Sequence, residues 1–430
     1  MSAAGSSDLR LKSAPPPSIV RRSFFIAGVA VVAGVLLATR RLDAFTNPQF
    51  YAEDGANWYA DAYNHGAWQA FTISYAGYYV TLPRIAALIA APFGAATTPL
   101  IYNVFGLAVQ VAPVVFFATR RFAHLVPWWW ARLLIGAVYL FMPSTELHVT
   151  VTNALWHLAV LGALVVLAPP ADTWGWRAFD VAVVALCALS GPFAFLLVPI
   201  AVIRWLVARN RWTLMLLAVL AVGALVQLYA LTHTTRVHHS VGASLRDFVL
   251  ILCDRIVLAG LFGEEGHTHV FVNGLPHATL IAALICVAAF AVTLYCALRA
   301  PWELRLFALF AFAIAAAGLA LPFGSPEGTA WPAFALTRAG ERYFFLAQLA
   351  WVVIVIWAAS RLPWRWFRGS AWTLTGAAFA SGVVTAWTYP AFVDDGWPAA
   401  AQRISAAPRG THVVIQIPPG PPWTVDITKR

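Results

Sequence analysis

Apolar stretches of roughly 15 to 22 residues recur along the chain between residues 24 and 388, separated by short polar segments. Each is about long enough to cross a hydrocarbon core as a helix, the form in which a backbone can satisfy its own hydrogen bonds in lipid. The pattern predicts eleven membrane-spanning helices, at residues 24–39, 100–119, 128–143, 153–168, 179–191, 193–208, 212–232, 276–298, 304–321, 343–360 and 371–388.

A further apolar stretch, residues 80–94, is short and contains Pro83, Arg84 and Pro92. If it crossed the membrane, Arg120 and Arg121 would lie outside and every later loop would invert. If it lies along the outer interface, the cytoplasmic loops hold 16 Lys and Arg against 4 acids, and the outer loops hold the other 12 and 14. The second arrangement fits the positive-inside rule, so we predict an interfacial outer helix here.

This topology divides the chain into three parts. Residues 1–23 are rich in Ser and Pro and are predicted to be a disordered cytoplasmic tail, and residues 24–388 form the transmembrane domain, with a first outer loop at 40–99. No small-residue cleavage site follows the first apolar run, so we predict an uncleaved helix. Residues 389–430 are predicted to be an outer tail in which two β-like runs, 412–417 and 424–427, could pair as a hairpin.

Composition supports a membrane protein. Apolar residues make up 61% of the chain and charged residues 11%, which excludes an ordinary soluble domain and predicts a lipid bilayer as partner. The net charge of +10 is spread over segment ends and does not form a stripe, so no nucleic-acid partner is expected. The four cysteines show no metal-ligand spacing, and the loop residues Glu264, Glu265, His267 and His269 match no metal template.

The most informative motif is FYAEDGANWYA, residues 50–60, just outside the first predicted helix. Glu53 and Asp54 are adjacent acids in an acid-poor chain, and charge against a bilayer is costly and tends to be functional. Neighbouring residues on a helix diverge by about 100°, so one acid would act and the other would assist. Asp54 is the preferred candidate for a catalytic base that takes a proton from a hydroxyl. The alternative is that both acids complement a helix dipole.

Three further groups of residues are candidates for a binding site at the outer face. Aromatic residues around the acidic pair, among them Tyr51, Trp58 and Tyr78, could stack on sugar rings or form an interface belt. The guanidinium of Arg84 could hold a lipid phosphate, pair with an acid of the first loop or extend to ordinary headgroups. The second group, at the outer mouth of the third and fourth predicted helices, comprises Glu146, His148, Asn153 and His157. The third group, Arg338 and Arg342, precedes the tenth predicted helix.

These last groups also have structural interpretations. Asn153 could be a helix N-cap rather than a cavity residue. Arg338 and Arg342 are four residues apart, so one helical face would present both guanidinium groups as a phosphate clamp. A simple Arg–Glu pair involving Glu341 would leave the same sequence pattern. The segment LSGPF, residues 189–193, predicts a tight turn between two helices, with Ser190 a weaker candidate for a pocket.

Taken together, these motifs resemble the C-type superfamily of membrane glycosyltransferases, in particular bacterial members with an AEDG motif. The motifs are AEDG at 52–55, Gly77–Tyr78 with Pro83–Arg84, GPF at 191–193, Arg342–Tyr343 and a Pro-rich segment with Trp423. The resemblance implies an all-α polytopic enzyme in the bacterial cytoplasmic membrane, with its N-terminus inside, its C-terminus outside and its active site in the periplasm. It also implies that Arg342 and Tyr343 contact the donor phosphate.

The implied reaction is inverting transfer of a hexose or pentose from a polyprenyl-phosphate or pyrophosphate donor to a glycan or lipid acceptor. Asp54 or Glu53 would be the base. No cofactor is predicted, although members of the superfamily differ in metal dependence and a divalent metal is therefore an open alternative. Two other functions compete: a transporter or flippase of a lipid-linked saccharide, and a polysaccharide ligase or polymerase that would use Arg and His in the loop at 233–275.

Overall fold

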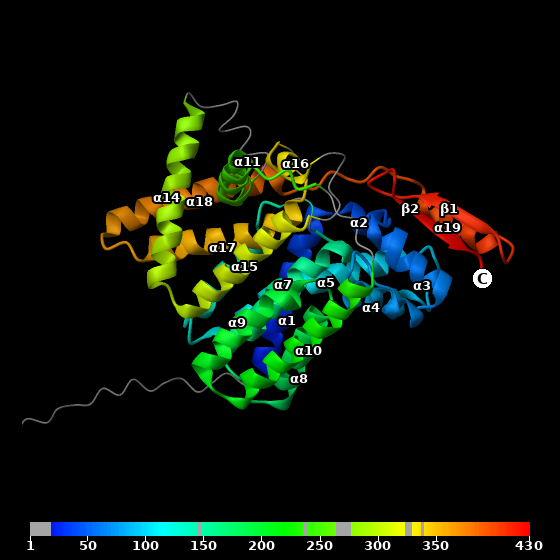
Figure 1. The fold of residues 1–430 in the computed structure, drawn as a ribbon, viewed down its shortest axis with the longest axis horizontal. Helices are drawn as coiled ribbons and strands as arrows, with labels where there is room; N and C mark the ends of the chain where they lie inside the picture. Colours follow the sequence, from blue (N-terminus) through cyan, green and yellow to red (C-terminus); the bar gives the residue numbers. More distant parts are fainter. Residues whose placement is uncertain are drawn as a thin grey trace, which may run out of the picture.

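The computed structural model describes residues 19–144, 146, 148–234, 240–263, 277–322, 329–336 and 339–430. The described chain is mostly helical and ends in a two-stranded antiparallel sheet (Figure 1). The long helices are α1 (Ile19–Arg40), α5 (Thr98–Ala118), α6 (Trp129–Leu140), α7 (Val151–Leu167), α8 (Trp174–Ala188), α9 (Phe193–Ala208), α10 (Arg211–His233), α14 (Ala278–Arg299), α15 (Trp302–Ala320), α17 (Glu341–Ser360) and α18 (Arg365–Ala386).

Shorter elements fill the connections between these helices. The segment between α1 and α5 contains a π-helix, η1, and α4 packs against α5 and α7. The shorter elements are α2 (Asp43–Thr46), η1 (Asp54–Tyr59), α3 (Ala60–His65), η2 (Gln69–Thr72), α4 (Thr81–Ala90), η3 (Arg120–Phe122), α11 (Leu245–Leu250), η4 (Ile251–Leu258), α12 (Ala259–Phe262), α16 (Ala330–Leu336), α19 (Trp397–Ala406), β1 (His412–Gln416) and β2 (Thr424–Thr428).

Each of the eleven apolar segments predicted to cross the membrane coincides with one long helix. Among the described residues, five helices (α1, α5, α10, α15 and α17) are long and apolar enough to cross a bilayer by length and composition, which indicates a multi-pass membrane protein. Crossing by the other six remains a prediction. Helix α1 begins at Ile19, earlier than the predicted start at residue 24, and residues 1–18 lie outside the described part.

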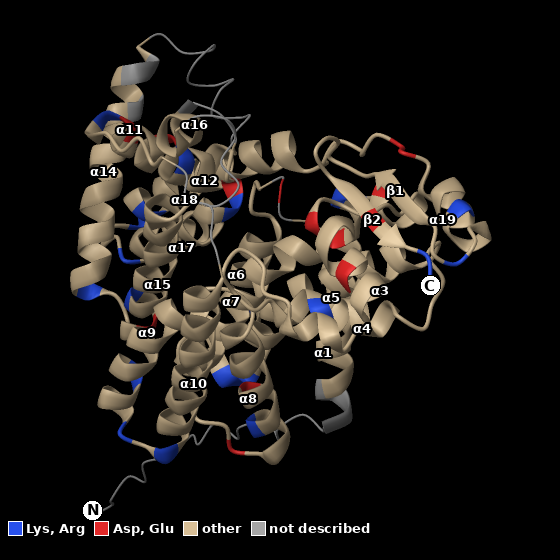
Figure 2. Cartoon of the chain, turned by 45° about the vertical axis from the view of Figure 1, so that its right-hand side comes forward, with Lys and Arg blue, Asp and Glu red and all other residues tan. Residues whose placement is uncertain are grey.

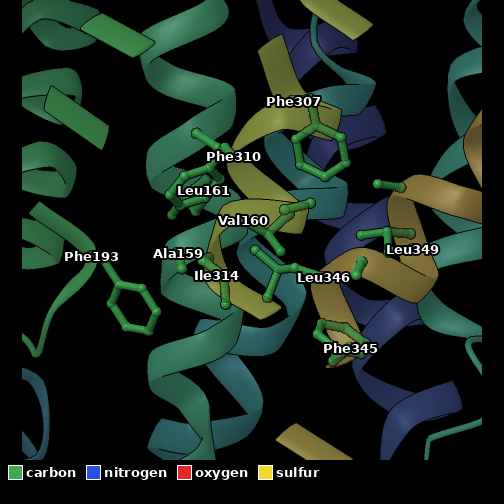
Figure 3. Packing of buried hydrophobic residues seen from close by; sticks show 14 of the residues in the cluster. Ala159, Val160, Leu161, Phe193, Phe307, Phe310, Ile314, Phe345, Leu346 and Leu349 are labelled. Atoms are coloured by element: carbon green, nitrogen blue, oxygen red, sulfur yellow. The ribbon is translucent and has the colours of Figure 1, made fainter. Parts of the chain in front are cut away.

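A large apolar core holds the bundle together. Side chains from α7, α9, α15 and α17 interdigitate there, as Figure 3 shows for Val160, Phe193, Phe310 and Phe345. Phe310 and Phe345 are fully buried. Removing one such aromatic ring from a core typically costs about 3–5 kcal/mol, so this packing fixes the helices that surround the candidate site.

The C-terminal tail forms a hairpin that covers the first loop. Strands β1 and β2 pair in antiparallel register, with Ile415 opposite Val425. β2 contacts both η1 and α3, and a second core cluster joins Phe50 and Trp58 of the first loop to Ile427 and to Trp397 of α19. A Cβ atom on Gly55 would meet Ile417 at 2.7 Å, so the hairpin packs directly on the acidic motif. The hairpin predicted from the sequence is confirmed.

Arg40 fixes the end of α1 beneath this region. Its guanidinium is buried and donates hydrogen bonds to five carbonyl oxygens from two separate segments, those of Leu140, Met142, Ser144, Ala386 and Trp387. These carbonyl groups follow the end of α6 or close α18, where the last turn of a helix leaves acceptors without an intrahelical partner. Arg40 therefore anchors the connection that leads from α6 to the start of α7.

Charges are unevenly distributed along the bundle. In Figure 2, blue Lys and Arg segments gather near the start of α8, whereas red acids cluster near α3 and β2. Helix α4 coincides with the stretch predicted to be an interfacial outer helix and buries one face against its neighbours, including Leu82 and Arg84. The helix is confirmed, while its position relative to a membrane remains a prediction.

Candidate functional site

A cavity of about 180 Å³ lies where the first loop meets α7, the turn between α8 and α9, α15 and the start of α17. It brings together segments that are more than 250 residues apart in sequence, from Glu53 to Tyr343. Its lining combines one carboxylate, one guanidinium and several aromatic rings. The polar and aromatic part of the lining comprises Glu53, Trp58, Tyr75, Tyr78, Thr152, Asn153, Trp156, Ser190, Arg342 and Tyr343.

The turn between α8 and α9 builds one wall. Gly191 has a φ of +97°, a conformation that glycine adopts without steric cost, and its amide donates to the carbonyl of Tyr79. The Ser190 hydroxyl accepts a hydrogen bond from the Leu82 amide at 3.0 Å. Gln227 of α10 donates to the Tyr79 carbonyl and accepts from the Tyr79 amide. These hydrogen bonds join the segment around the start of α4 to the predicted Gly–Pro turn and to α10.

Glu53 is the carboxylate that lines the cavity. It is 8% exposed, and its Oε1 accepts a hydrogen bond from the Tyr75 hydroxyl at 3.2 Å. The preceding Ala52 has a φ of +45°, which costs free energy for a residue with a Cβ atom and is found most often at functional sites. The Ala52 amide donates to the Pro418 carbonyl of the tail at 2.7 Å. The hairpin therefore helps to hold Glu53 at the cavity wall.

Asp54 lies behind this wall and does not line the cavity. Its carboxylate is 1% exposed and accepts three hydrogen bonds, from the Val151 amide, the Thr152 amide and the Thr152 hydroxyl, at 3.1, 2.8 and 2.8 Å. These amides are the first of α7, whose own hydrogen bonds leave them without an acceptor. Asp54 therefore caps α7 from a distant segment and fixes the helix that carries Asn153 and Trp156.

The role of base predicted for Asp54 can be compared with this position. Burial raises the pKa of Asp54 to about 7, opposed by the hydrogen bonds from Thr152 and Val151. A pKa near neutrality would favour a base, but both oxygens accept hydrogen bonds from the start of α7 and Asp54 is not part of the cavity lining. Of the two acids, Glu53 is the one that lines the cavity, and which of them acts as a base remains a prediction.

Arg342 supplies the positive charge of the site. Its Nη1 lies 2.7 Å from Glu146 Oε1, its backbone amide donates to Glu146 Oε2, and the Glu146 amide donates to Glu341. The Arg342 and Glu146 side chains are 24% and 18% exposed. Arg342 thus pairs with Glu146, an acid far away in sequence that the Arg–Glu alternative did not name. Arg338, the proposed second half of the clamp, lies outside the described residues.

Aromatic rings complete the charged end of the cavity. Trp58 and Tyr75 meet edge to face at 5.0 Å, and Trp156 contacts Tyr343 at 5.7 Å. Gly318 of α15 allows Tyr343 to approach closely, because a Cβ atom there would lie 2.7 Å from the Tyr343 ring. Ring faces at this spacing can stack on the C–H face of a sugar or on another flat group.

The other end of the cavity is apolar. Side chains of α9 and α15 line it, namely Phe193, Leu196, Ile314, Ala317 and Leu321. The cavity therefore joins a charged, aromatic end to an apolar end within the bundle. Such a lining fits a ligand with a polar head and a hydrocarbon part better than it fits a free ion.

Other residues predicted for the site lie around the cavity. Asn153 lines the cavity, and its side-chain amide donates to the Glu146 carbonyl. Its backbone N–H donates to the Thr150 hydroxyl, so Thr150 and not Asn153 is the N-cap residue of α7. Tyr51 stacks on Phe392 of the tail at 5.0 Å outside the lining, and burial raises its pKa. Trp58 and Tyr78 line the cavity as predicted.

The two histidines are buried next to the site and not in it. His148 is bonded to the Ser144 carbonyl at 2.8 Å, and burial lowers its pKa well below the usual range. His157 pairs with the Tyr139 hydroxyl at 2.6 Å within the bundle. Neither lines the cavity, so their contacts are those of structural residues. Substrate binding by either histidine remains a prediction.

Arg84 is buried and forms an ion pair with an acid of the first loop. Its side chain is 1% exposed and lies 2.7 Å from Asp61, over the face of Trp58 at 4.8 Å, with further bonds to the carbonyls of Asn57 and Ile73. The terminal nitrogens of Arg84 are thus bonded within the protein, and a role in holding a lipid phosphate remains a prediction. Pairing with an acid of the first loop, one of the three alternatives, is what the structure shows.

The part of the chain that the structure describes contains no group of three or more His, Cys, Asp and Glu residues arranged to hold a metal ion. Glu264, Glu265, His267 and His269 lie outside that part. Thr152 and Gly318 were not anticipated, because their roles depend on contacts with Asp54 and Tyr343 that no local pattern reveals. Comparison with models of protein families, with curated proteins and with solved structures finds no match to this chain.

Proposed function

We propose that the protein is an inverting glycosyltransferase that moves a sugar from a polyprenyl-phosphate or pyrophosphate donor to a glycan or lipid acceptor. The observation that carries the proposal is the amphiphilic cavity in which Glu53 and Arg342 share one lining with five tryptophan and tyrosine side chains and an apolar wall. The charged end fits a sugar phosphate and the wall made by Phe193, Leu196 and Ile314 fits a hydrocarbon chain.

In the proposed reaction Glu53 accepts the proton of an acceptor hydroxyl. The oxygen forms a bond to the anomeric carbon from the face opposite the phosphate, the carbon–oxygen bond to the phosphate breaks, and the phosphate leaves with that electron pair. Arg342 stabilises the negative charge that develops on the leaving group, since a guanidinium matches phosphate geometry. Tyr75 orients Glu53 through its hydrogen bond, and Trp58, Tyr78 and Trp156 hold the sugar.

We further propose that the cavity faces the periplasm of a bacterial cell, with the N-terminus in the cytoplasm and the C-terminus outside. The gathering of Lys and Arg at the opposite end of the bundle, near the start of α8, supports this orientation through the positive-inside rule (Figure 2). A donor carried on a lipid would reach the cavity laterally from the membrane. No nucleic acid is a partner in this scheme.

The proposal is tested with the protein reconstituted in proteoliposomes and a panel of synthetic polyprenyl-phosphate hexoses and pentoses, each carbon-14 labelled in the sugar. A membrane extract supplies the acceptor. Transfer predicts labelled product together with free polyprenyl phosphate in equal amounts, both abolished in the Glu53→Gln variant. Movement of intact labelled donor between leaflets without release of polyprenyl phosphate would instead identify a flippase and refute the proposed chemistry.

A further inference from the structure

A second and larger hollow, of about 810 Å³, lies apart from the Glu53 cavity and shares no lining residue with it. Three parts of the chain enclose it: the first half of α1, the connection between α5 and α6, and the connection between α7 and α8. Its lining comprises Phe25, Ile26, Ala118, Thr119, Arg120, Arg121, His124, Trp129, Arg132, Pro169, Pro170, Asp172, Thr173 and Trp176. We call it the α1–α8 hollow.

The α1–α8 hollow carries positive charge that nearby acids do not balance. Arg121 is neutralised by Asp180 and also bonds the Pro169 carbonyl, and His124 lies 3.3 Å from Glu303. Asp172 is the one carboxylate in the lining, and it is exposed. Against it stand Arg120 and Arg132, neither of which has an ion pair with any described residue.

Arg132 is held so that one edge of its guanidinium remains available. Its Nε donates to the Ala118 carbonyl and its Nη1 to the carbonyls of Val126 and Pro127, so the side chain is 5% exposed and fixed in position. Carbonyl oxygens do not cancel its charge. Arg120 is exposed beside it on the same lining. A fixed guanidinium with a second, exposed guanidinium beside it favours a bound anion between them.

The opposite side of the hollow is apolar and continues into the outer surface of the bundle. Phe25 and Trp129 meet edge to face at 5.8 Å. Trp128, Trp129 and Trp130 are 64%, 57% and 51% exposed in succession, the arrangement that tryptophans adopt at the level of lipid headgroups. A ligand bound to Arg120 and Arg132 would therefore extend its remaining part over Phe25 and along α1 into the bilayer.

From this geometry we infer that the α1–α8 hollow binds an anionic phospholipid, with its phosphate between Arg120 and Arg132 and its acyl chains along Phe25 and Ile26. Basic pockets between membrane helices bind such headgroups. The site is separate from the one proposed for sugar transfer and does not depend on that function. A lipid here would join α1 to the α5–α6 and α7–α8 connections.

The test is native mass spectrometry of the full-length protein after delipidation, with dioleoyl phosphatidylglycerol or dioleoyl phosphatidylcholine added back. The variant Arg120→Gln removes a side chain that makes no hydrogen bond with any described residue, so folding is expected to be retained, and Arg120→Gln with Arg132→Gln removes both charges. The matched control is Arg209→Gln, which removes an exposed positive charge bonded to its own helix at Leu206. Thermal unfolding checks that each variant is folded.

We expect wild-type protein to retain phosphatidylglycerol over phosphatidylcholine, with retention falling about fivefold for each arginine removed and unchanged in Arg209→Gln. Arg120→Lys should restore part of the loss. Equal retention of the two lipids, or phosphatidylglycerol binding unaffected in folded Arg120→Gln, would overturn the inference. Complete displacement of the lipid by millimolar glycerol phosphate would show that the site takes a soluble phosphate instead, and would also overturn it.

Discussion

The assignment of Asp54 to capping α7 leads to a quantitative prediction for the Asp54→Asn variant. An amide retains one oxygen, which can keep the two bonds from Thr152, but places an NH2 group against the Val151 amide. One buried N–H then loses its acceptor, at a cost of about 1–3 kcal/mol. Because Asp54 does not line the cavity, transfer per folded molecule should fall by severalfold at most, whereas the free energy of unfolding drops by about 2 kcal/mol.

The difference in unfolding free energy between wild-type and Asp54→Asn should also depend on pH. The folded-state pKa of Asp54, about 7, lies above its ordinary value of 3.8, so the folded state holds a proton that the unfolded state releases. The stabilisation from that proton is present at low pH and is lost as the pH rises from about 4 through 7. Between pH 5 and pH 7, wild-type should lose roughly 2 kcal/mol relative to Asp54→Asn, which cannot titrate.

Equilibrium unfolding in mixed micelles across this pH range, followed by circular dichroism, measures both quantities. Sugar transfer is measured in parallel on the same preparations and divided by the folded fraction. The reasoning would be refuted if Asp54→Asn unfolded like wild-type at every pH yet transferred no sugar. That outcome would make Asp54 the base and would mean that Thr152 opens to admit the acceptor.

Three further predictions concern the walls of the cavity. Gly318→Ala places a Cβ atom about 2.7 Å from the Tyr343 ring, so it should destabilise the protein by about 1–3 kcal/mol and raise the donor KM. The control Gly376→Ala, whose Cβ atom would have no neighbour within 4 Å, should change neither quantity. Unchanged stability in both variants would contradict the packing of Gly318 against Tyr343. Arg84→Ala should lower the free energy of unfolding by about 2 kcal/mol and leave the donor KM unchanged, because Arg84 pairs with the partly exposed Asp61. A raised donor KM without destabilisation would instead support binding of the donor phosphate by Arg84. Arg342→Gln should lower kcat by about 100-fold in transfer assays, and an unchanged kcat would remove it from the reaction.

Much of the helical framework follows from the sequence, because hydrophobic segment length and Gly–Pro turns are local signals. Each predicted span coincides with a helix, and the LSGPF segment forms the expected turn at Gly191. The tail hairpin was also recognisable, from two β-like runs separated by Pro and Gly. These features depend on residues close together in the chain.

The arrangement of the site depended on contacts that the sequence does not encode locally. Adjacent acids were recognisable as a candidate pair, but the partner of each is far away: Tyr75 for Glu53, and the start of α7 for Asp54. The same holds for Arg84, whose pairing with Asp61 was one of several alternatives. Charge and aromatic density pointed to residues that meet at one cavity, while the position of each carboxylate relative to that cavity depends on three-dimensional packing.

The central claim is that Glu53, at the wall of the amphiphilic cavity, is the base. The most direct test is the single-turnover rate of sugar transfer by Glu53→Gln across pH 5 to 9, with bound donor quantified in the same samples. The account predicts a folded protein that binds donor like wild-type and transfers sugar at least about 100-fold more slowly at every pH. Transfer by Glu53→Gln at the wild-type rate would contradict it.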